Sequence, residues 1–357
     1  MSVIVGQHIM IGLSGLSLTS DEKKFIVENE ICGVTLFGRN VSTPEQVRNL
    51  CAEVQSLRHQ MKNKLPLFIG IDMEGGRVAR LKAPFTIWPP LKRIGDLDSP
   101  NLSFSFSQAM GDELRAVGIN LDYAPCADVF TNPQNTVIGD RSVSADPEMV
   151  AKHVSALIRG YIKSGVVSCV KHFPGHGNTL IDSHLDLPVE NANLERLESV
   201  EFIPFKKALK SRVPMLMSAH IKFPNIDPEW PATLSEIFLT QIVREKMRFK
   251  GIIITDDMGM KAMSAHFPAD LLPVRALSAG ADILLYCNEP ETPPIALNAI
   301  QNAIDSNTLS KSLLEKSLER ILECKNEYLK NPDPLDMKQV SQIVGHPDHL
   351  KIAQDLR

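Results

Sequence analysis

The segment 171–188, KHFPGHGNTLIDSHLDLP, holds the densest set of side chains able to do acid–base chemistry. It contains three histidines, and Asp182 lies two residues before His184. A carboxylate at this spacing can accept a hydrogen bond from the imidazole, which fixes the ring tautomer and favours the imidazolium form. Such a histidine titrates near neutral pH, which suits a group that first donates and then accepts a proton. The pair is therefore a candidate general acid/base.

A second candidate ends the apolar run in GIIITDDMGM. A carboxylate delivered to a strand end by these β-branched residues can attack a substrate carbon. Asp256 and Asp257 alternate to opposite sides of such a strand, so one would face the site and the other would have a structural role. The spacing favours Asp256 as the nucleophile but leaves the order of the two aspartates nearly open.

Other charged side chains could hold a hydroxylated ligand. Asp72 and Arg80 flank the double glycine of IGIDMEGGRVARL, and Arg141 lies in IGDRS. A carboxylate accepts hydrogen bonds from vicinal sugar hydroxyls, and arginine is a rigid donor fork. The double glycine is not a phosphate-binding loop, because it lacks both the GxGxxG pattern and a following Lys-Ser/Thr.

His172, His176 and His184 raise a metal-dependent alternative, because clusters of imidazole and carboxylate bind zinc. Their H-x3-H-x7-H spacing matches neither a common zinc helix nor a zinc finger. Pro174 and the glycines beside it prevent the helix that would align the first two histidines. We therefore expect no metal ion, and the chemistry above requires no organic cofactor.

The elements that must position these residues are short apolar runs alternating with amphipathic segments. Most runs are apolar on both faces, which is typical of parallel strands covered on each side. The predicted strands are 7–12, 33–37, 66–71, 119–124, 166–172, 214–219, 251–256 and 281–286. Eight strands, mostly separated by helices, predict an α/β fold consisting of a single (β/α)8 TIM-type barrel.

In such a barrel, functional groups lie at the C-terminal ends of the strands and in the loops that follow. The predicted strands end in a succession of polar side chains: Asp72, Asp122, Lys171, His172, His220, Asp256, Asp257 and Asn288. One polar residue can simply mark where a strand meets water. So many together indicate a functional site at this end of the barrel.

We predict one catalytic barrel domain over residues 1–330, because neither a low-complexity linker nor a short-period repeat interrupts it. Its helices are expected to start at capping residues followed by proline, as in Thr43-Pro44 and Thr292-Pro293. The sequence NPDP breaks the chain after Leu329. Residues 331–357 are expected to form a C-terminal helical tail that packs on the barrel or begins an extension.

Composition excludes several classes of partner. Lys and Arg number 38 against 42 Asp and Glu, a formal charge of −4, and the basic residues are scattered, so we expect no nucleic acid. Six cysteines without a CxxC pair are typical of reduced thiols. The N-terminal MSVIVGQHIMIGLSG lacks a basic n-region, and no run approaches the roughly 20 apolar residues of a membrane helix. We expect a cytoplasmic monomer, without a membrane partner, that acts on a small molecule.

Together, KHFPGHG followed by DSH, the strand-end TDD, and IGID-x-EGGRV resemble glycoside hydrolase family 3. The DSH loop is similar to that of the β-N-acetylglucosaminidase branch, the single-domain bacterial enzymes of peptidoglycan recycling. The likeness runs through most of residues 5–330 and includes IGDRS and the PATLS segment at 231–235. One departure is Met73, which stands where the family commonly has Gln.

The resemblance implies that Asp256 is the nucleophile and that His184, paired with Asp182, is the acid/base. The residues that it implies for binding the N-acetylglucosamine unit are Asp72, Arg80, Arg141, Lys171 and His172. The implied enzyme is a β-N-acetylhexosaminidase that removes terminal β-linked N-acetylglucosamine from muropeptides, in which that sugar is joined to 1,6-anhydro-N-acetylmuramic acid. It would work with retention through a covalent glycosyl-enzyme intermediate, in cell-wall recycling and without a cofactor.

Three alternatives stay open from the sequence. A β-glucosidase of the same family would prefer sugars that lack the N-acetyl group. A metal-dependent hydrolase would use the cluster of His172, His176 and His184. A non-catalytic sugar-binding protein would bind the substrate without turning it over, although such a protein has no need for an acid, a base and a nucleophile together.

Overall fold

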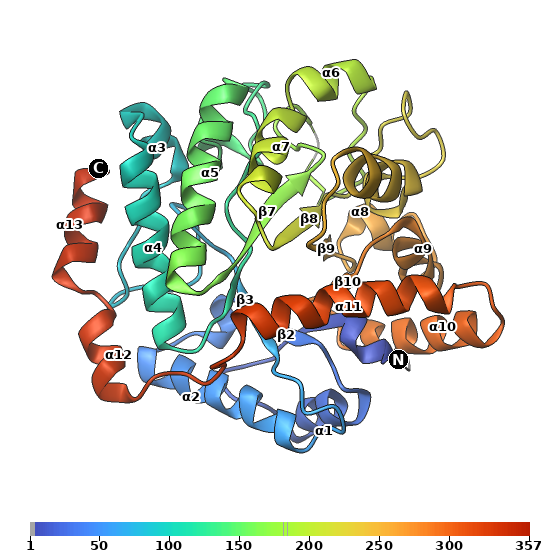
Figure 1. Cartoon of the computed structure of the whole chain (residues 1–357), viewed down its shortest axis with the longest axis horizontal. Coiled ribbons are helices and arrows are strands. Elements are labelled where there is room, and N and C mark those ends of the chain that lie inside the picture. Colours follow the sequence, from blue (N-terminus) through green and yellow to red (C-terminus); the bar gives the residue numbers. More distant parts are fainter. Residues whose placement is uncertain (1–3, 181, 184) are drawn as a thin grey trace.

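The structure of the chain, a computed structural model, describes residues 4–180, 182–183 and 185–357. A closed barrel of parallel strands, in the order β1-β10-β9-β8-β7-β6-β3-β2, forms its centre, with helices around it (Figure 1). The strands are β1 (Ile9–Gly12), β2 (Gly33–Leu36), β3 (Phe68–Ile71), β6 (Leu121–Asp122), β7 (Val167–Phe173), β8 (Met215–Ser218), β9 (Ile252–Asp257) and β10 (Ile283–Tyr286). The predicted strands and the predicted (β/α)8 fold are confirmed.

Alternation along the strands selects the residues that face into the barrel. Ile252 and Ile254 of β9 belong to the apolar cluster that fills the barrel interior, and so does Cys169 of β7. Because side chains two positions apart share a face, the same alternation directs Lys171 and Asp256 toward the barrel axis, beyond the last apolar layer. These two residues lie at the C-terminal ends of their strands, which together form the mouth of the barrel.

A small antiparallel hairpin that the sequence did not predict follows β3 directly. It consists of β4 (Met73–Gly75) and β5 (Val78–Ala79). The turn needs glycine, since Gly75 and Gly76 have φ of +95° and +57°, and a Cβ on Gly75 would lie 2.4 Å from the carbonyl oxygen of Pro89. The hairpin brings Arg80 back to Asp72.

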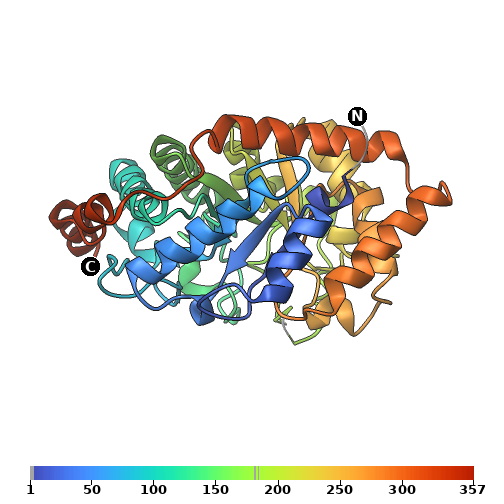
Figure 2. The ribbon, with the colours of Figure 1, turned by 90° about the horizontal axis from the view of Figure 1, so that it is seen from below.

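The α-helices cover the outside of the barrel (Figures 1 and 2). They are α1 (Ser20–Asn29), α2 (Pro44–Ser56), α3 (Leu91–Leu97), α4 (Pro100–Ala116), α5 (Pro147–Ser164), α6 (Leu194–Ser199), α7 (Phe202–Lys210), α8 (Lys261–Ser264), α9 (Leu271–Ala279), α10 (Thr292–Asp305), α11 (Lys311–Tyr328), α12 (Met337–Ile343) and α13 (Pro347–Asp355). A π-helix spans Ile237–Lys246. The predicted cap of α2 is confirmed, because Thr43 accepts a hydrogen bond from the N–H of Gln46. At α10 the prediction was wrong: Thr292 lies inside the first turn, and its hydroxyl donates to the carbonyl of Glu289.

Helix α11 closes the N-terminal end of the barrel, opposite the mouth, and helices α12 and α13 cover one side of the barrel. Lys325 of α11 donates to Gln7 Oε1 (2.8 Å) and to the carbonyl oxygen of Cys32 (3.0 Å), at the end opposite the mouth. Helices α12 and α13 pack beside α4 (Figure 1), where His349 Nδ1 lies 3.0 Å from Glu113 Oε1. All six cysteines are buried and free. Within the described part of the chain, no helix has the length and apolar character needed to span a membrane.

Candidate active site

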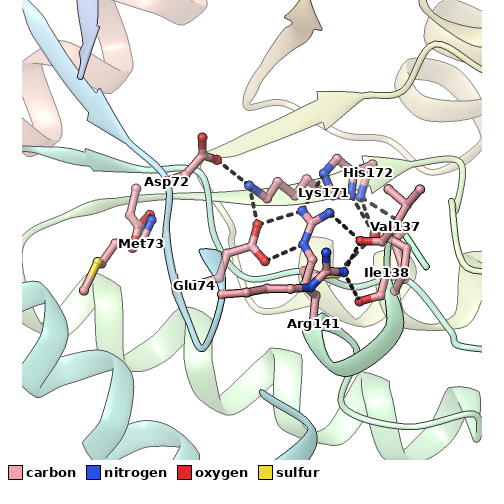
Figure 3. Close-up of polar contacts among 12 residues, drawn as sticks. Asp72, Met73, Glu74, Val137, Ile138, Arg141, Lys171 and His172 are labelled. Atoms are coloured by element: carbon pink, nitrogen blue, oxygen red, sulfur yellow. Dashed lines mark hydrogen bonds and ion pairs between the residues drawn. The ribbon is translucent and has the colours of Figure 1, made fainter. Parts of the chain in front are cut away.

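An ion pair between β7 and the end of β3 organises the mouth of the barrel (Figure 3). Lys171 Nζ lies 2.7 Å from Asp72 Oδ1 and 2.7 Å from Oε1 of Glu74, in the hairpin. The lysine side chain is only 3% exposed, and burial alone would lower its pKa. The charges of Asp72 and Glu74 outweigh burial and raise the pKa of Lys171, so the ammonium is a fixed positive charge.

Glu74 joins this pair to Arg141, which ends a short 3-10 helix at Gly139–Arg141. Arg141 donates to both carboxylate oxygens of Glu74 at 2.8 Å, in a bidentate pair. Burial opposes ionisation of Glu74, but the charges of Arg141 and Lys171 overcome it and lower the pKa of Glu74 below its usual range. Met73, which replaces the glutamine common in the family, is buried and points away from this cluster (Figure 3).

His172 extends this network of polar contacts from Arg141 to Asp128. Its Nδ1 donates to Asp128 Oδ2 at 2.7 Å, and its Nε2 lies 3.1 Å from Arg141 Nη2. Since arginine can only donate, this arrangement is satisfied by a neutral ring whose Nε2 accepts. Asp128 also accepts from the backbone N–H of His176 at 2.6 Å. Burial opposes ionisation of Asp128, but His172 and His176 lower its pKa, so it is an anion that orients His172.

A metal site at this network does not fit its residues. Among the described residues, the group of possible ligands is Cys126, Asp128 and His172, whose ligand atoms lie within 4.8 Å of one another. The Cys126 thiol donates to Asp128 at 3.1 Å, and burial raises its pKa, so it is not a thiolate. The ring proton of His172 also points at Asp128, and the Arg141 cation adjoins His172. These atoms satisfy one another without an ion.

The three histidines of the metal-dependent alternative have other partners where the structure describes them. The rings of His172 and His176 are 6.0 Å apart between centroids, in an edge contact. His176 Nδ1 lies 2.6 Å from Thr179 Oγ1, and its Nε2 lies 3.3 Å from Ser183 Oγ. Burial lowers the pKa of His176 to about 4, so its ring is neutral near pH 7. His184 lies outside the described residues.

The two aspartates at the end of β9 have different surroundings. Asp257 is 8% exposed and accepts hydrogen bonds from the N–H groups of Gly259 (3.0 Å) and Cys287 (3.1 Å) and from Asn288 Nδ2 (3.1 Å). Its contacts tie the end of β9 to the end of β10, which is a structural role. Asp256 is partly exposed, on the inner side of the strand.

Asp72 and Asp256 face the same interior space, although they end different strands. Burial raises the pKa of the Cys169 thiol, and the charges of Asp72 and Asp256 both raise it further. The same two carboxylates act in the same direction on Cys287. The binding candidate from β3 and the nucleophile candidate from β9 therefore both lie near these two thiols, at the same end of the barrel.

Arg80 forms the rim of the site beside Asp72. Its Nη2 lies 3.4 Å from Asp72 Oδ2, and its guanidinium lies 5.8 Å from the ring centre of Phe37. Arg39 approaches the same ring, at 4.7 Å. Phe37 therefore lies beside two cations at the edge of the mouth.

The loop that carries the predicted acid/base contacts the segment that follows β9. The carbonyl oxygen of Ser183 accepts a hydrogen bond from the N–H of Ala262 at 3.2 Å, and the carbonyl of Asp182 accepts from the N–H of Leu185 at 2.9 Å. This contact joins residues 182–183 to α8, the short helix that follows the strand carrying Asp256. The pairing of Asp182 with His184 stays a prediction.

Sequence reasoning missed Glu74 and Asp128, although each lies in a conspicuous segment. Glu74 is the acid of EGGRV, and Asp128 ends the run NLDYAPCAD. Two other strand-end residues proved structural: His220 Nε2 lies 3.0 Å from the carbonyl oxygen of Asp257, and the fully buried Asp122 accepts from the N–H of Met73. Burial raises the pKa of Asp122 well above its usual value.

A closed (β/α)8 barrel whose mouth holds paired carboxylates and fixed cations is typical of an enzyme acting on a polar, hydroxyl-rich small molecule. Residues 3–324 match the model of the glycosyl hydrolase family 3 N-terminal domain. The chain belongs to glycosyl hydrolase family 3, as its motifs predict.

Similar proteins are consistent with this membership. "Beta-hexosaminidase" of Pseudomonas aeruginosa is 35% identical over 298 residues, which are 82% of this chain and 86% of that protein. "Beta-hexosaminidase A" of Pseudoalteromonas piscicida is 31% identical over 373 residues. The match includes 95% of this chain but only 60% of the length of that protein. With these relatives, the predicted class of enzyme is confirmed.

Solved structures show the same fold. The family 3 β-N-acetylglucosaminidase of Paenibacillus sp. FPU-7 superposes with a TM-score of 0.92 at 34% identity, covering 99% of this chain and 67% of that one. NagZ of Neisseria gonorrhoeae, in complex with N-trifluoroacetyl-D-glucosamine, superposes with a TM-score of 0.78 at 29% identity, covering 98% and 96% of the two chains.

Proposed function

We propose that the protein is a retaining β-N-acetylglucosaminidase that removes terminal, non-reducing N-acetylglucosamine from muropeptides through a covalent glycosyl-enzyme intermediate. Asp256 is the nucleophile in this proposal, and His184, paired with Asp182, is the acid/base. The observation that carries it is that Lys171 and Asp256 follow the inward-facing residues of β7 and β9 at the same end of the barrel, where Lys171 pairs with Asp72.

The ionic cluster supplies a rigid binding surface for the sugar. Asp72 is held by Lys171 and Arg80, so its oxygens are charged acceptors of defined direction for two neighbouring hydroxyls. Lys171, Arg141 and His172 are fixed by buried Glu74 and Asp128, and the remaining N–H groups of Lys171 and Arg141 can donate to sugar oxygens. Since these groups are already oriented, little conformational entropy is lost when the sugar binds.

The reaction is a double displacement. The Asp256 carboxylate attacks the anomeric carbon, and the bond to the leaving oxygen breaks while His184 gives that oxygen a proton. Neutral His184 then takes a proton from water, which attacks the same carbon and releases Asp256. A neutral imidazole near Asp256 also avoids the repulsion that a second carboxylate would experience there.

The substrate and the cellular role belong to the same proposal. Relatives named β-hexosaminidase and a solved β-N-acetylglucosaminidase support N-acetylglucosamine as the sugar. Muropeptides as substrates, action in cell-wall recycling and a location in the cytoplasm follow from the resemblance of the DSH loop to the recycling branch.

Turnover of chromogenic aryl β-glycosides tests the proposal. We expect release of the aryl alcohol from the N-acetyl-β-D-glucosaminide and little from the β-D-glucoside, at rates that EDTA does not change. Proton NMR of the first sugar released should show the β-anomer. Preference for the glucoside would identify a β-glucosidase, loss of activity in EDTA with rescue by zinc a metal-dependent hydrolase, and binding without turnover a sugar-binding protein. Hydrolysis of a disaccharide muropeptide should exceed that of chitobiose if recycling is the role.

A further inference from the structure

The segment 182–186, which includes the predicted acid/base, is closed into a turn by its own backbone. The carbonyl oxygen of Asp182 accepts hydrogen bonds from the N–H groups of Leu185 (2.9 Å) and Asp186 (3.2 Å). Residues that the proposed mechanism does not use hold this turn near both of its ends. The contacts that hold the turn therefore bear on where a proton donor can act.

Ser183 is the buried anchor of the turn. It is 3% exposed, whereas Leu185, two residues further on, is 70% exposed. The Ser183 hydroxyl lies 3.3 Å from His176 Nε2, and its carbonyl oxygen accepts a hydrogen bond from the N–H of Ala262 at 3.2 Å. Ser183 thus contacts both the first part of its own loop and the helix α8 that follows β9.

His176 is a fixed partner for the Ser183 hydroxyl. Its backbone N–H donates to Asp128 Oδ1 at 2.6 Å, and its ring Nδ1 lies 2.6 Å from Thr179 Oγ1. Asn135 Nδ2 donates to the carbonyl oxygen of His176 at 2.7 Å. Because the backbone and the ring of His176 are both held, the ring can fix the position of Ser183.

His266 holds the other end of the turn. Its Nε2 lies 2.7 Å from Asp186 Oδ1, and this hydrogen bond lowers the pKa of the Asp186 carboxyl. The same carboxylate oxygen accepts from the N–H of Leu187 at 2.8 Å, which aligns the Asp186 side chain with its own backbone. Since His266 lies two residues beyond the end of α8, both ends of the turn are joined to the α8 segment.

The α8 segment is joined in turn to the strand that carries the nucleophile candidate. The carbonyl oxygen of Asp257 accepts from the N–H of Met260 at 3.0 Å, and that of Met260 accepts from the N–H of Met263 at 2.8 Å. The carbonyl oxygen of Met263 accepts from the N–H of His266 at 3.1 Å. Successive backbone hydrogen bonds therefore connect the end of β9 to the residue that holds the turn.

We propose that Ser183 and His266 are positioning residues, which hold the acid/base in place relative to the strand that carries the nucleophile. The inference rests on the proposed function, in which the turn carries the proton donor and β9 carries Asp256. A general acid must be within hydrogen-bond reach of the leaving oxygen, and a displacement of about 1 Å can cost about a hundredfold in rate. Neither positioning residue reacts in this role, because each acts through the location of the turn.

Two aryl N-acetyl-β-D-glucosaminides with different leaving groups test the role. Dinitrophenolate leaves with little help from a proton, whereas phenolate needs one, so the phenyl glycoside depends more on a well-placed acid. We expect His266→Ala to lower kcat/KM roughly two- to fivefold for the phenyl glycoside, as loss of one exposed contact allows, and to leave the 3,4-dinitrophenyl glycoside unchanged. Ser183→Ala should show the same selectivity, and the double variant should lose about tenfold on the phenyl glycoside. His266→Gln, which keeps a donor for Asp186, should restore most of the loss.

His346→Ala is the matched control. The side chain of His346 is 44% exposed, against 40% for His266, and it lies 3.6 Å from Asp348 Oδ2. It precedes α13, on the other side of the molecule from α8 (Figure 1), so its removal should leave the ratio of the two rates unchanged. An equal loss on both glycosides in His266→Ala and Ser183→Ala, or no loss on either, would overturn the positioning role, because a merely structural role lowers activity through the amount of folded protein.

Hydrogen exchange of the Ala262 N–H measures the contact without turnover. Because Ser183 accepts from this group, its exchange should be roughly two to five times faster in His266→Ala and unchanged in His346→Ala. Unchanged exchange in His266→Ala would show that His266 does not hold the turn and would overturn the inference. A wild type that hydrolysed neither glycoside would refute the proposed function instead, and the exchange of Ala262 would still show whether His266 holds the turn.

Discussion

Lys171 Nζ lies 2.7 Å from Asp72 Oδ1, although the residues are 99 positions apart, and the pair spans the short strand β6 between β3 and β7. Glu74 Oε1 lies 2.7 Å from the same ammonium nitrogen, so Lys171 forms an ion pair with both carboxylates. One buried cation thereby fixes two carboxylates at the mouth, and the orientation of the sugar-binding surface depends on it.

Removal of this cation should damage both binding and folding. Lys171→Met leaves buried Glu74 and the neighbouring Asp72 short of positive charge, and we expect a loss of roughly 3–5 kcal/mol in the free energy of unfolding. Misplacement of Asp72 should lower kcat/KM at least about a hundredfold. Urea unfolding and steady-state kinetics measure the two effects. Lys163→Met, on the exposed side of α5, is the control, and equal effects of both substitutions would contradict the role of Lys171.

Substitution of the two aspartates of β9 should have different effects, one mainly on activity and the other on the free energy of unfolding. Asp256→Ala should abolish turnover with little change in unfolding free energy. Asp257→Ala removes the acceptor for Gly259, Cys287 and Asn288, and should cost about 1–3 kcal/mol of stability. Thermal unfolding and kinetics on both variants test this. Full activity in Asp256→Ala would refute its assignment as the nucleophile.

Asp128 should act on the reaction through His172. Asp128→Asn replaces an acceptor of the His172 Nδ1 proton by an amide that can also donate, so the population of the ring tautomer that leaves Nε2 as the acceptor should fall. We expect a loss of roughly 10- to 100-fold in kcat/KM, by analogy with other residues that orient a functional histidine. Nitrogen-15 NMR of the His172 ring reports the tautomer directly. An unchanged tautomer together with lost activity would show that Asp128 has only a structural role.

His176 should make the protein less stable as the pH falls. Its pKa, about 4 in the folded protein against 6.5 for the free group, means that below pH 6.5 the unfolded chain binds a proton that the folded chain does not. Stability is then fully present above pH 6.5 and declines toward pH 4, by roughly 3 kcal/mol in total. His176→Gln should flatten this part of the stability–pH curve in urea titrations, whereas His59→Gln, at an exposed position, should not. An unchanged slope in His176→Gln would exclude the effect.

The fold could be predicted from the sequence because parallel strands covered on both sides appear as short apolar runs. The β4–β5 hairpin could not, since two- and three-residue strands carry too little periodicity and the double glycine indicates only a turn. Asp256 could be placed at a strand end by the run before it. Glu74 could not be placed, because its role depends on Arg141 and Lys171, and the Arg141 contact spans 67 positions.

Trapping the covalent intermediate tests the central claim most directly. A 5-fluoro-N-acetyl-β-D-glucosaminyl fluoride slows both steps and should accumulate the glycosyl-enzyme. Mass spectrometry of the intact protein should show one added sugar, and peptide mapping should locate it on Asp256. A label on Asp257 or Asp72, or release of the inverted sugar with no labelled protein, would contradict the proposed mechanism.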